Sequence, residues 1–209
     1  MNDPTSKEKR IHSSGIKPFS YYKCVIPDHF YCVPMHWHSE FEINFIREGS
    51  AEFICGDEKF TSAKGDIIIT QPNVLHSIYP CANTNQVYDT LVFSSEIFGS
   101  SQSDRYINEC IRPLTDGSMR ISAHITPEHH YYAELAVTAE NIFSCAKGDT
   151  PQLDMLMRSE LIKLFWLLET EAEQSGFNGR SDSVIRPALE YIAEHYSENI
   201  TVAHLAECV

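Results

Sequence analysis

A short stretch of the chain, HWHSEFEINFIREG, concentrates side chains that can bind a metal ion. It contains His36 and His38, two residues apart, with Glu42 four residues further on. Side chains on a strand alternate between two faces, so these three positions of one parity share a face if no bulge separates them. Asn44 has the same parity, and a further imidazole, His76, follows the apolar run DIIITQPN. The other parity is apolar, which predicts a strand with one polar-lined face.

Three imidazoles and one carboxylate form a ligand set that suits Zn, Ni, Fe or Mn, and an octahedral ion held this way keeps positions open for water or substrate. We therefore expect a metal site at His36, His38, Glu42 and His76, with a metal-free pocket of hydrogen-bonding imidazoles as the alternative. Nearby aromatic side chains could stack on a ligand, although such residues more often belong to a core. The residues expected to bind a ligand are His36, Trp37, His38, Glu42, Asn44, His76 and Tyr88.

The elements that must position these groups are short strands. Turn signals such as Gly49-Ser50, Gly56-Asp57 and Pro72-Asn73 separate them, because glycine and asparagine supply positive φ and proline a fixed φ. Many short strands at regular spacing predict a sandwich or barrel of antiparallel sheet. The predicted strand runs are YYKCVIP, EFEINFI, SAEFICG, EKFTS, DIIITQ, HSIYP, QVYDTLVF and MRISAHI.

After Ile125 the apolar spacing changes to that of a helix. Thr126 and Pro127 are typical of an N-cap followed by proline in the first turn, and the helix they begin is expected to reach about Ala146. The sequence GDTP ends this helix and begins a second one. The broad apolar stripe of the second helix predicts packing on the barrel by one face and a dimer contact by another. The residues expected at the dimer contact are Leu153, Leu156, Met157, Leu161, Leu164, Phe165 and Leu168.

Residues 173–182 are polar, contain two glycines and lack apolar periodicity, which predicts a linker. Beyond it the sequence predicts a helix over about 185–196 and a second helix that starts after Thr201 as its N-cap. The three expected units are a barrel with an N-terminal arm over 1–125, a helical hairpin over 126–175, and a linker with the start of another domain over 176–209.

The metal-binding stretch resembles the first motif of the cupin family, H-x-H-x3-E-x6-G, position for position. The segment GDIIITQPNVLH resembles the second cupin motif, but PNVLH replaces the general P-x-G-x-x-H. That shorter form is similar to the version found in sensor domains of AraC-type transcription regulators. The resemblance implies an α+β chain, with a cupin-like antiparallel β-barrel of the jelly-roll kind followed by helices.

The C-terminal segment IRPALEYIAEHYSENITVAHLAECV resembles the opening of the AraC-type DNA-binding domain, which contains a helix-turn-helix. In that family a helix of the kind I-x-x-A-L-x-Y-I-x-x-H-Y precedes an I-T-x-x-x-L-A helix. The recognition helix that enters the major groove would follow beyond Val209. We therefore expect a sensor domain that is truncated inside its DNA-binding domain.

Composition sets limits on the partners. The formal net charge of -13, from 16 Lys plus Arg against 29 Asp plus Glu, opposes binding of this chain to a polyphosphate backbone. No run approaches the ~20 apolar residues of a membrane span, and the polar N-terminal stretch has no signal-peptide core. Seven scattered cysteines without a CxxC pair are typical of reduced thiols. We expect a cytoplasmic protein with no membrane partner.

The resemblance implies the effector-binding and dimerisation region of an AraC-family transcription regulator. A small-molecule effector, sugar-like in the family's common case, would bind in the barrel and bias two arrangements of the arm or dimer. We expect a homodimer that is not an enzyme and that contacts DNA only through the full-length protein. One alternative is a metal-dependent cupin enzyme, an isomerase or dioxygenase with the same four ligands. Another is a dimerisation module with an empty barrel.

Overall fold

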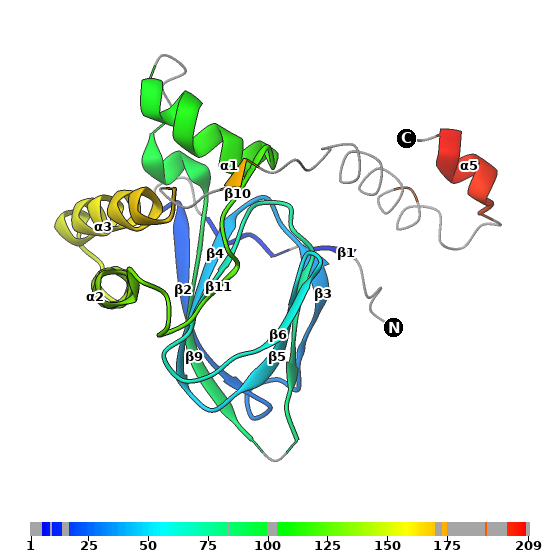
Figure 1. The fold of residues 1–209 in the computed structure, drawn as a ribbon, viewed down its shortest axis with the longest axis horizontal. Coiled ribbons are helices and arrows are strands. Elements are labelled where there is room, and N and C mark those ends of the chain that lie inside the picture. The colour runs from blue at the N-terminus through cyan, green and yellow to red at the C-terminus, as the bar shows by residue number, and fades with distance from the viewer. Residues whose placement is uncertain are drawn as a thin grey trace.

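In the computed structural model two sheets face each other and close into a barrel, and helices cover one outer side of it (Figure 1). The structure describes residues 6–8, 10–13, 17–82, 84–99, 104–169, 173–174, 191 and 200–207. Among these residues, no helix has both the length and the apolar character needed to cross a membrane.

The two sheets have five strands each. The first has the order β1 (Ser6–Lys7), β3 (Val33–Trp37), β8 (His76–Pro80), β5 (Ala51–Cys55) and β6 (Glu58–Thr61). The second has the order β11 (His124–Ile125), β7 (Ile67–Thr70), β4 (Phe41–Glu48), β9 (Gln86–Phe93) and β2 (Phe19–Ile26). Neighbours are antiparallel except β1 and β3, which are parallel. The predicted cupin-like antiparallel barrel is confirmed.

Alternation along β4 separates a polar interior from an apolar exterior, as its sequence predicts. Phe41, Ile43 and Phe45 pack into the core between the second sheet and the helices. Glu42 and Asn44 point the other way, into the barrel, where they are buried together. The polar parity of β4 therefore lines the inside of the barrel, and the apolar parity holds the helices.

The hairpin between β4 and β5 requires the glycine that the sequence places there. Gly49 has a φ of +75°, and a Cβ at this position would lie 1.7 Å from the carbonyl oxygen of Asn85. Only glycine combines this backbone conformation with such a close approach of another chain segment.

Helical segments follow β9 and β11. After β9 come a 3-10 turn (Ser95–Phe98), a π-helical turn (Ile107–Ile111) and α1 (Arg112–Asp116). The two long helices are α2 (Tyr132–Ala146) and α3 (Pro151–Glu169), which pack on each other and on the second sheet. The expected helical hairpin is thus present, and Thr150 Oγ1 accepts a hydrogen bond from Leu153 N at 3.3 Å at the start of α3.

Two local expectations differ from the structure. The first long helix begins at Tyr132, because Thr126 starts a turn instead: its carbonyl accepts from His129 N at 3.0 Å. The run MRISAHI is split into β10 (Met119–Arg120) and β11, and β10 pairs with β12 (Glu173–Gln174). The Gln71 side chain lies at this break, where it donates to the carbonyl of Met119 and accepts from the amide of Ile121.

Most of the C-terminal expectations lie outside the described residues. These are the linker, apart from residues 173–174, and the helix over 185–196, apart from residue 191. The helix after Thr201 is confirmed as α5 (Val202–Glu207), and the Thr201 carbonyl accepts from Leu205 N at 3.1 Å.

The inside of the barrel is divided into an apolar floor and a polar mouth. The floor is a cluster of buried side chains: Ile26, Ile46, Ala51, Phe53, Ile68, Ile78 and Tyr88. Polar side chains from β3, β4, β8 and β9 fill the other half. The polar side chains of the barrel interior are therefore gathered at the mouth.

Candidate metal and ligand site

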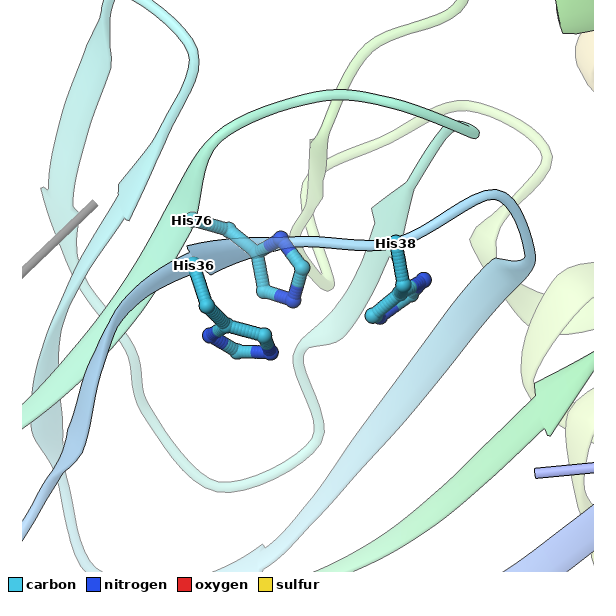
Figure 2. Close-up of side chains that lie close together, drawn as sticks. All are labelled: His36, His38 and His76. Atoms are coloured by element: carbon cyan, nitrogen blue, oxygen red, sulfur yellow. The ribbon is translucent and has the colours of Figure 1, made fainter. Parts of the chain in front are cut away.

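The three histidines of the two motifs meet at the barrel mouth (Figure 2). His36 of β3 lies opposite His76 of β8, and their ring centroids are 4.2 Å apart. His38 lies in the connection between β3 and β4, and its carbonyl accepts from Asn73 N at 2.7 Å. One nitrogen from each ring lies within 4.8 Å of the others. The turn of the second motif is thus tied to the first.

These residues do not share a single strand, which was the simplest expectation from their parity. β3 ends at Trp37, the chain turns through residues 38–40, and β4 begins at Phe41 in the other sheet. His36 and Glu42 therefore approach each other from facing sheets. The site therefore lies inside the barrel, whereas a single flat strand would have placed it on a surface.

Each of the three imidazoles has one nitrogen bound to a main-chain carbonyl. His36 and His76 bond the carbonyl two residues earlier through Nδ1 at 2.9 Å, and His38 bonds the one two residues later at 3.1 Å. A carbonyl oxygen only accepts, so each Nδ1 carries a proton and donates, which leaves Nε2 as the nitrogen able to bind a metal. Nε2 of His76 is buried without a hydrogen-bond partner. This orphaned atom, aimed at the other rings, fits a metal ligand.

Glu42 adds a carboxylate to the histidines and is held in place from below. Its Oε2 lies 3.4 Å from His38 Nε2 and 3.7 Å from His76 Nε2. Its Oε1 accepts from Asn44 Nδ2 at 2.7 Å, and Asn44 Oδ1 accepts from Thr90 Oγ1 at 2.6 Å. Three imidazoles with one such carboxylate make a donor set that fits a divalent transition-metal ion.

The electrostatics of the mouth favour an ionised carboxylate. Burial alone would raise the pKa of Glu42, but hydrogen bonding and the charges of His38 and His76 hold that pKa well below its usual range. Burial lowers the pKa values of His36 and His38, yet the carboxylates of Glu8 and Glu42 outweigh it and raise both. For His76 burial dominates and its pKa is lowered.

The structure brings Asn44 to the four predicted metal ligands and places Tyr88 in the barrel interior, but it turns Trp37 away from the histidines. Trp37 is buried on the opposite side of β3 from His36, with the Lys7 ammonium 5.1 Å from its ring centroid. Tyr88 is part of the barrel floor, and burial raises the pKa of its hydroxyl.

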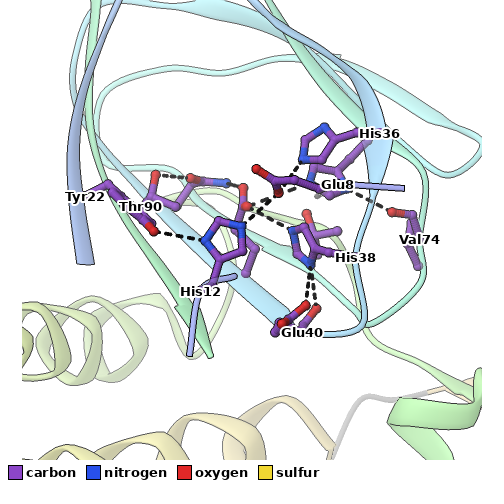
Figure 3. Close-up of polar contacts among 12 residues, drawn as sticks. Glu8, His12, Tyr22, His36, His38, Glu40, Val74 and Thr90 are labelled. Carbon is purple, nitrogen blue, oxygen red and sulfur yellow. Dashed lines mark hydrogen bonds and ion pairs between the residues drawn. The ribbon is translucent and has the colours of Figure 1, made fainter. Parts of the chain in front are cut away.

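Two further residues of the site come from the N-terminal arm, the segment before β2, of which residues 6–8, 10–13 and 17–18 are described (Figure 3). Glu8 Oε2 lies 3.5 Å from His36 Nε2 and 2.9 Å from His12 Nε2. His12 is buried, and its ring centroid is 5.7 Å from that of His38. Sequence reasoning missed both, since the sole signal is a Glu and a His four residues apart in a polar segment.

The residues expected at a dimer contact lie mostly inside the protomer. Met157, Leu161, Leu164, Phe165 and Leu168 are buried in the core that α3 shares with the barrel, with Leu153 half-buried beside it and Leu156 exposed. The exposed apolar side chains of the two helices are Val137, Met155, Leu156, Ile162 and Trp166. In the described part of the chain Cys24, Cys32, Cys55, Cys81 and Cys145 form no disulfide bond.

Comparison with known proteins identifies the relatives of this chain. A family model described as AraC-like ligand binding domain matches residues 25–177. YdeC of Bacillus subtilis, an uncharacterized HTH-type transcriptional regulator, is 23% identical over 217 residues, 98% of this chain and 71% of YdeC. YbfI of the same organism, also an uncharacterized HTH-type transcriptional regulator, is 23% identical over 177 residues, 83% of this chain and 60% of YbfI. Among solved structures, a cupin-like protein from Thermotoga maritima has a TM-score of 0.33 at 18% identity, covering 39% of this chain and 62% of that chain.

A barrel with a filled floor, a polar mouth and convergent imidazoles defines a cupin-type ligand-binding domain. The family match covers most of the chain, from the second strand to beyond α3. The chain therefore belongs to the family of AraC-like ligand binding domains and is the ligand-sensing part of a transcription regulator. It spans 71% and 60% of the length of the two regulators that it matches.

Proposed function

We propose that the barrel senses a small molecule through a divalent metal ion held by His36, His38, Glu42 and His76. The observation that carries this proposal is the common orientation of the histidines, whose Nδ1 atoms are all bound to main-chain carbonyls while Nε2 of His76 is buried without a hydrogen-bond partner. Zn, Ni, Fe and Mn all suit such donors. A bound ion supplies positive charge and open positions for oxygen or nitrogen donors of the effector.

The residues of the chain provide orientation and discrimination around the ion. Asn44 holds the Glu42 carboxylate through Oε1 and is itself fixed by Thr90, so the carboxylate keeps Oε2 directed at the imidazoles. The buried floor excludes water from below. A small polar effector, such as a sugar-like molecule with several hydroxyl groups, would match this polar mouth.

We propose a regulator without catalytic activity. The same donors would also serve a metal-dependent isomerase or dioxygenase. The resemblance of the C-terminal segment to a helix-turn-helix domain, and the names of the two B. subtilis relatives, support the regulator. DNA would be bound by the full-length protein, because the acidic chain described here repels phosphate.

We also propose a homodimer. Met155, Ile162 and Trp166 recur at seven and four residues on α3 and are exposed, with Val137 of α2 exposed as well. This spacing places the three α3 residues on one face of the helix, separate from the face buried on the barrel. A second copy with the same face could cover them in a symmetric contact.

Metal analysis and thermal unfolding test the sensing proposal. The protein purified without chelator is expected to contain close to one ion per chain, to lose thermal stability on chelation, and to regain it with Zn, Ni, Fe or Mn. His76→Gln should remove this gain. A panel of sugars and sugar acids should then contain members that raise the melting temperature of the metal-loaded protein only. Fewer than a few tenths of an ion per chain, with no stabilisation by added metal, would overturn the metal site.

A further inference from the structure

The N-terminal arm lies along the strand that carries the first motif. β1 pairs in parallel with β3, with Ser6 opposite His36 and Lys7 opposite Trp37, and Glu8 N donates to the Trp37 carbonyl at 2.9 Å. Alternation directs Lys7 over the Trp37 ring and Glu8 to the other side, toward the imidazoles (Figure 3). The backbone pairing thus sets where the Glu8 carboxylate lies.

The Glu8 carboxylate faces the nitrogen of His36 that is available for a metal. Nδ1 of His36 donates to the Pro34 carbonyl, while Nε2 lies 3.5 Å from Glu8 Oε2. A neutral ring with its proton on Nδ1 has a lone pair on Nε2, and a lone pair repels a carboxylate unless a second proton or a metal ion lies between them. The contact of Glu42 Oε2 with His38 Nε2, at 3.4 Å, repeats the same arrangement.

Two carboxylates therefore converge on the Nε2 atoms, and the charge of a divalent ion matches them. Within the described part of the chain, the ion-pair partners of Glu8 and Glu42 are all histidines. Lys7 is turned away over Trp37, and Arg10 lies over the Tyr22 ring at 4.5 Å. A divalent ion among neutral imidazoles would leave the mouth without net charge.

We infer that Glu8 is a further ligand of the barrel metal, carried to the ion by the N-terminal arm, so that metal binding fastens β1 onto β3. The inference rests on the metal site proposed above and adds a ligand outside the cupin motifs. Metal binding and docking of the arm on β3 are then thermodynamically coupled, so each favours the other.

His12 is the positioning residue for this ligand. Its Nε2 lies 2.9 Å from Glu8 Oε2, and its Nδ1 lies 3.0 Å from the Tyr22 hydroxyl. Ser20 Oγ donates to the His12 carbonyl at 2.5 Å, so β2 holds both the ring and the main chain of His12. The His12 side chain is buried, with 5% of its surface exposed, and it holds the Glu8 carboxylate at the barrel mouth.

The test compares Glu8→Gln with Glu40→Gln in the whole 209-residue chain. Both changes remove one negative charge near the mouth, but the Glu40 carboxylate lies 3.8 Å from Nδ1 of His38, on the side away from the metal-binding nitrogens. Zinc affinity is measured by competition with a chromophoric chelator, and hydrogen exchange of residues 6–8 is followed with and without zinc. Thermal unfolding in chelator verifies that both variants are folded.

The expected result is that Glu8→Gln weakens zinc binding by ~10-fold to ~100-fold and that zinc no longer slows exchange in the arm. Glu40→Gln should keep wild-type affinity and the zinc-dependent protection. If Glu8→Gln binds zinc as tightly as wild type and keeps that protection, the inference is overturned while the metal site stands. If the wild-type protein itself binds no zinc, the proposed metal site fails and Glu8 with it.

Discussion

At the scale of single residues, groups outside the proposed metal ligands decide which atoms face the mouth. The carbonyls bound to Nδ1 leave Nε2 of each histidine toward the mouth. A second chain of hydrogen bonds runs from Thr90 through Asn44 to Glu42. Breaking one bond of this chain leaves a buried polar atom without that partner, so the loss of one member should affect the next.

Thr90→Val tests this chain of hydrogen bonds. Valine has nearly the shape of threonine but no hydroxyl, so Asn44 Oδ1 loses its donor inside the barrel. We expect the free energy of unfolding, measured in urea with chelator present, to fall by ~1–3 kcal/mol. Thr90→Ser keeps the donor and should cost ~1 kcal/mol or less for its missing methyl. Equal stability of the two variants would show that the hydroxyl bond contributes nothing.

The motif residues could be predicted from sequence because their spacing carries a chemical requirement. Two histidines separated by one residue, with a carboxylate and a later histidine, indicate one ligand set whatever the exact path of the chain. Glu8 and His12 could not be predicted, because their place depends on the pairing of β1 with β3, and a two-residue strand leaves no pattern in the sequence. Trp37 has the opposite parity to His36 on β3 and points away from the histidines, which its ring type alone does not reveal.

At the scale of elements, one carboxylate joins three strands to a helix. Asp89 of β9 accepts from the Tyr21 hydroxyl of β2 at 2.6 Å and from Arg47 Nε of β4 at 2.7 Å. Arg47 also pairs with Glu140 of α2, and Lys147 approaches Asp89 at 3.5 Å. The network crosses the boundary between the second sheet and the helical hairpin, at the edge of their shared apolar core.

Asp89→Asn should lower the free energy of unfolding by ~1–3 kcal/mol at pH 7, because Arg47 and Tyr21 lose a charged acceptor. Burial by itself raises the pKa of Asp89, but the bonds from Tyr21 and Arg47 outweigh it and lower that pKa in the folded state. A lowered folded pKa means that the ionised group stabilises the fold above its unfolded pKa, and that this stability is lost as pH falls through the folded pKa. The difference between wild type and variant should therefore shrink below about pH 4.

Urea unfolding at several pH values measures this difference. The control is Asp149→Asn, since Asp149 is 96% exposed and contacts Lys17 at 3.3 Å on the surface, where a pair contributes ~0–1 kcal/mol. A loss at Asp89 no larger than at Asp149, or one that persists unchanged at pH 3, would contradict the assigned role.

Strands were the most predictable elements, because alternation and turn residues mark them directly. Seven of the predicted runs correspond to strands β2 and β4 to β9. β3 contains a proline and a bulge between Val33 and His36, so its alternation is broken. The π-helical turn at Ile107–Ile111 left no signal that periodicity can detect. The start of α2 was predicted too early because a Thr-Pro pair begins turns as well as helices.

At the scale of the whole molecule, the outer face of α3 exposes large apolar side chains. Trp166 is 60% exposed and Met155 70% exposed, although the same helix buries a full apolar face on the barrel. Large apolar side chains gathered on one exposed surface are typical of a protein contact. The apolar stripe of α3 that predicted a dimer contact is buried within the protomer. The proposed dimer contact is instead formed by the exposed side chains of Met155, Ile162 and Trp166.

Trp166→Glu should weaken the proposed dimer by ~10-fold or more, because aromatic residues contribute strongly to contacts between subunits. Sedimentation equilibrium measures the association, and circular dichroism verifies that the fold is unchanged. Tyr31→Glu is the matched control, since Tyr31 is 72% exposed on the connection between β2 and β3. A wild-type mass of one chain at all concentrations, or an unchanged dimer in Trp166→Glu, would exclude this face as the contact.

The filled lower half of the barrel limits what the protein can detect. With Phe53, Ile78 and Tyr88 occupying that volume, a molecule that enters past the histidines soon meets hydrocarbon. Long or branched compounds would protrude between the sheets and push against the arm, whereas a compact hydrophilic one would leave it undisturbed. Phe53→Ala would deepen the space inside the barrel. If the variant then binds bulkier compounds better than the wild type does, the depth of the barrel selects ligands by size.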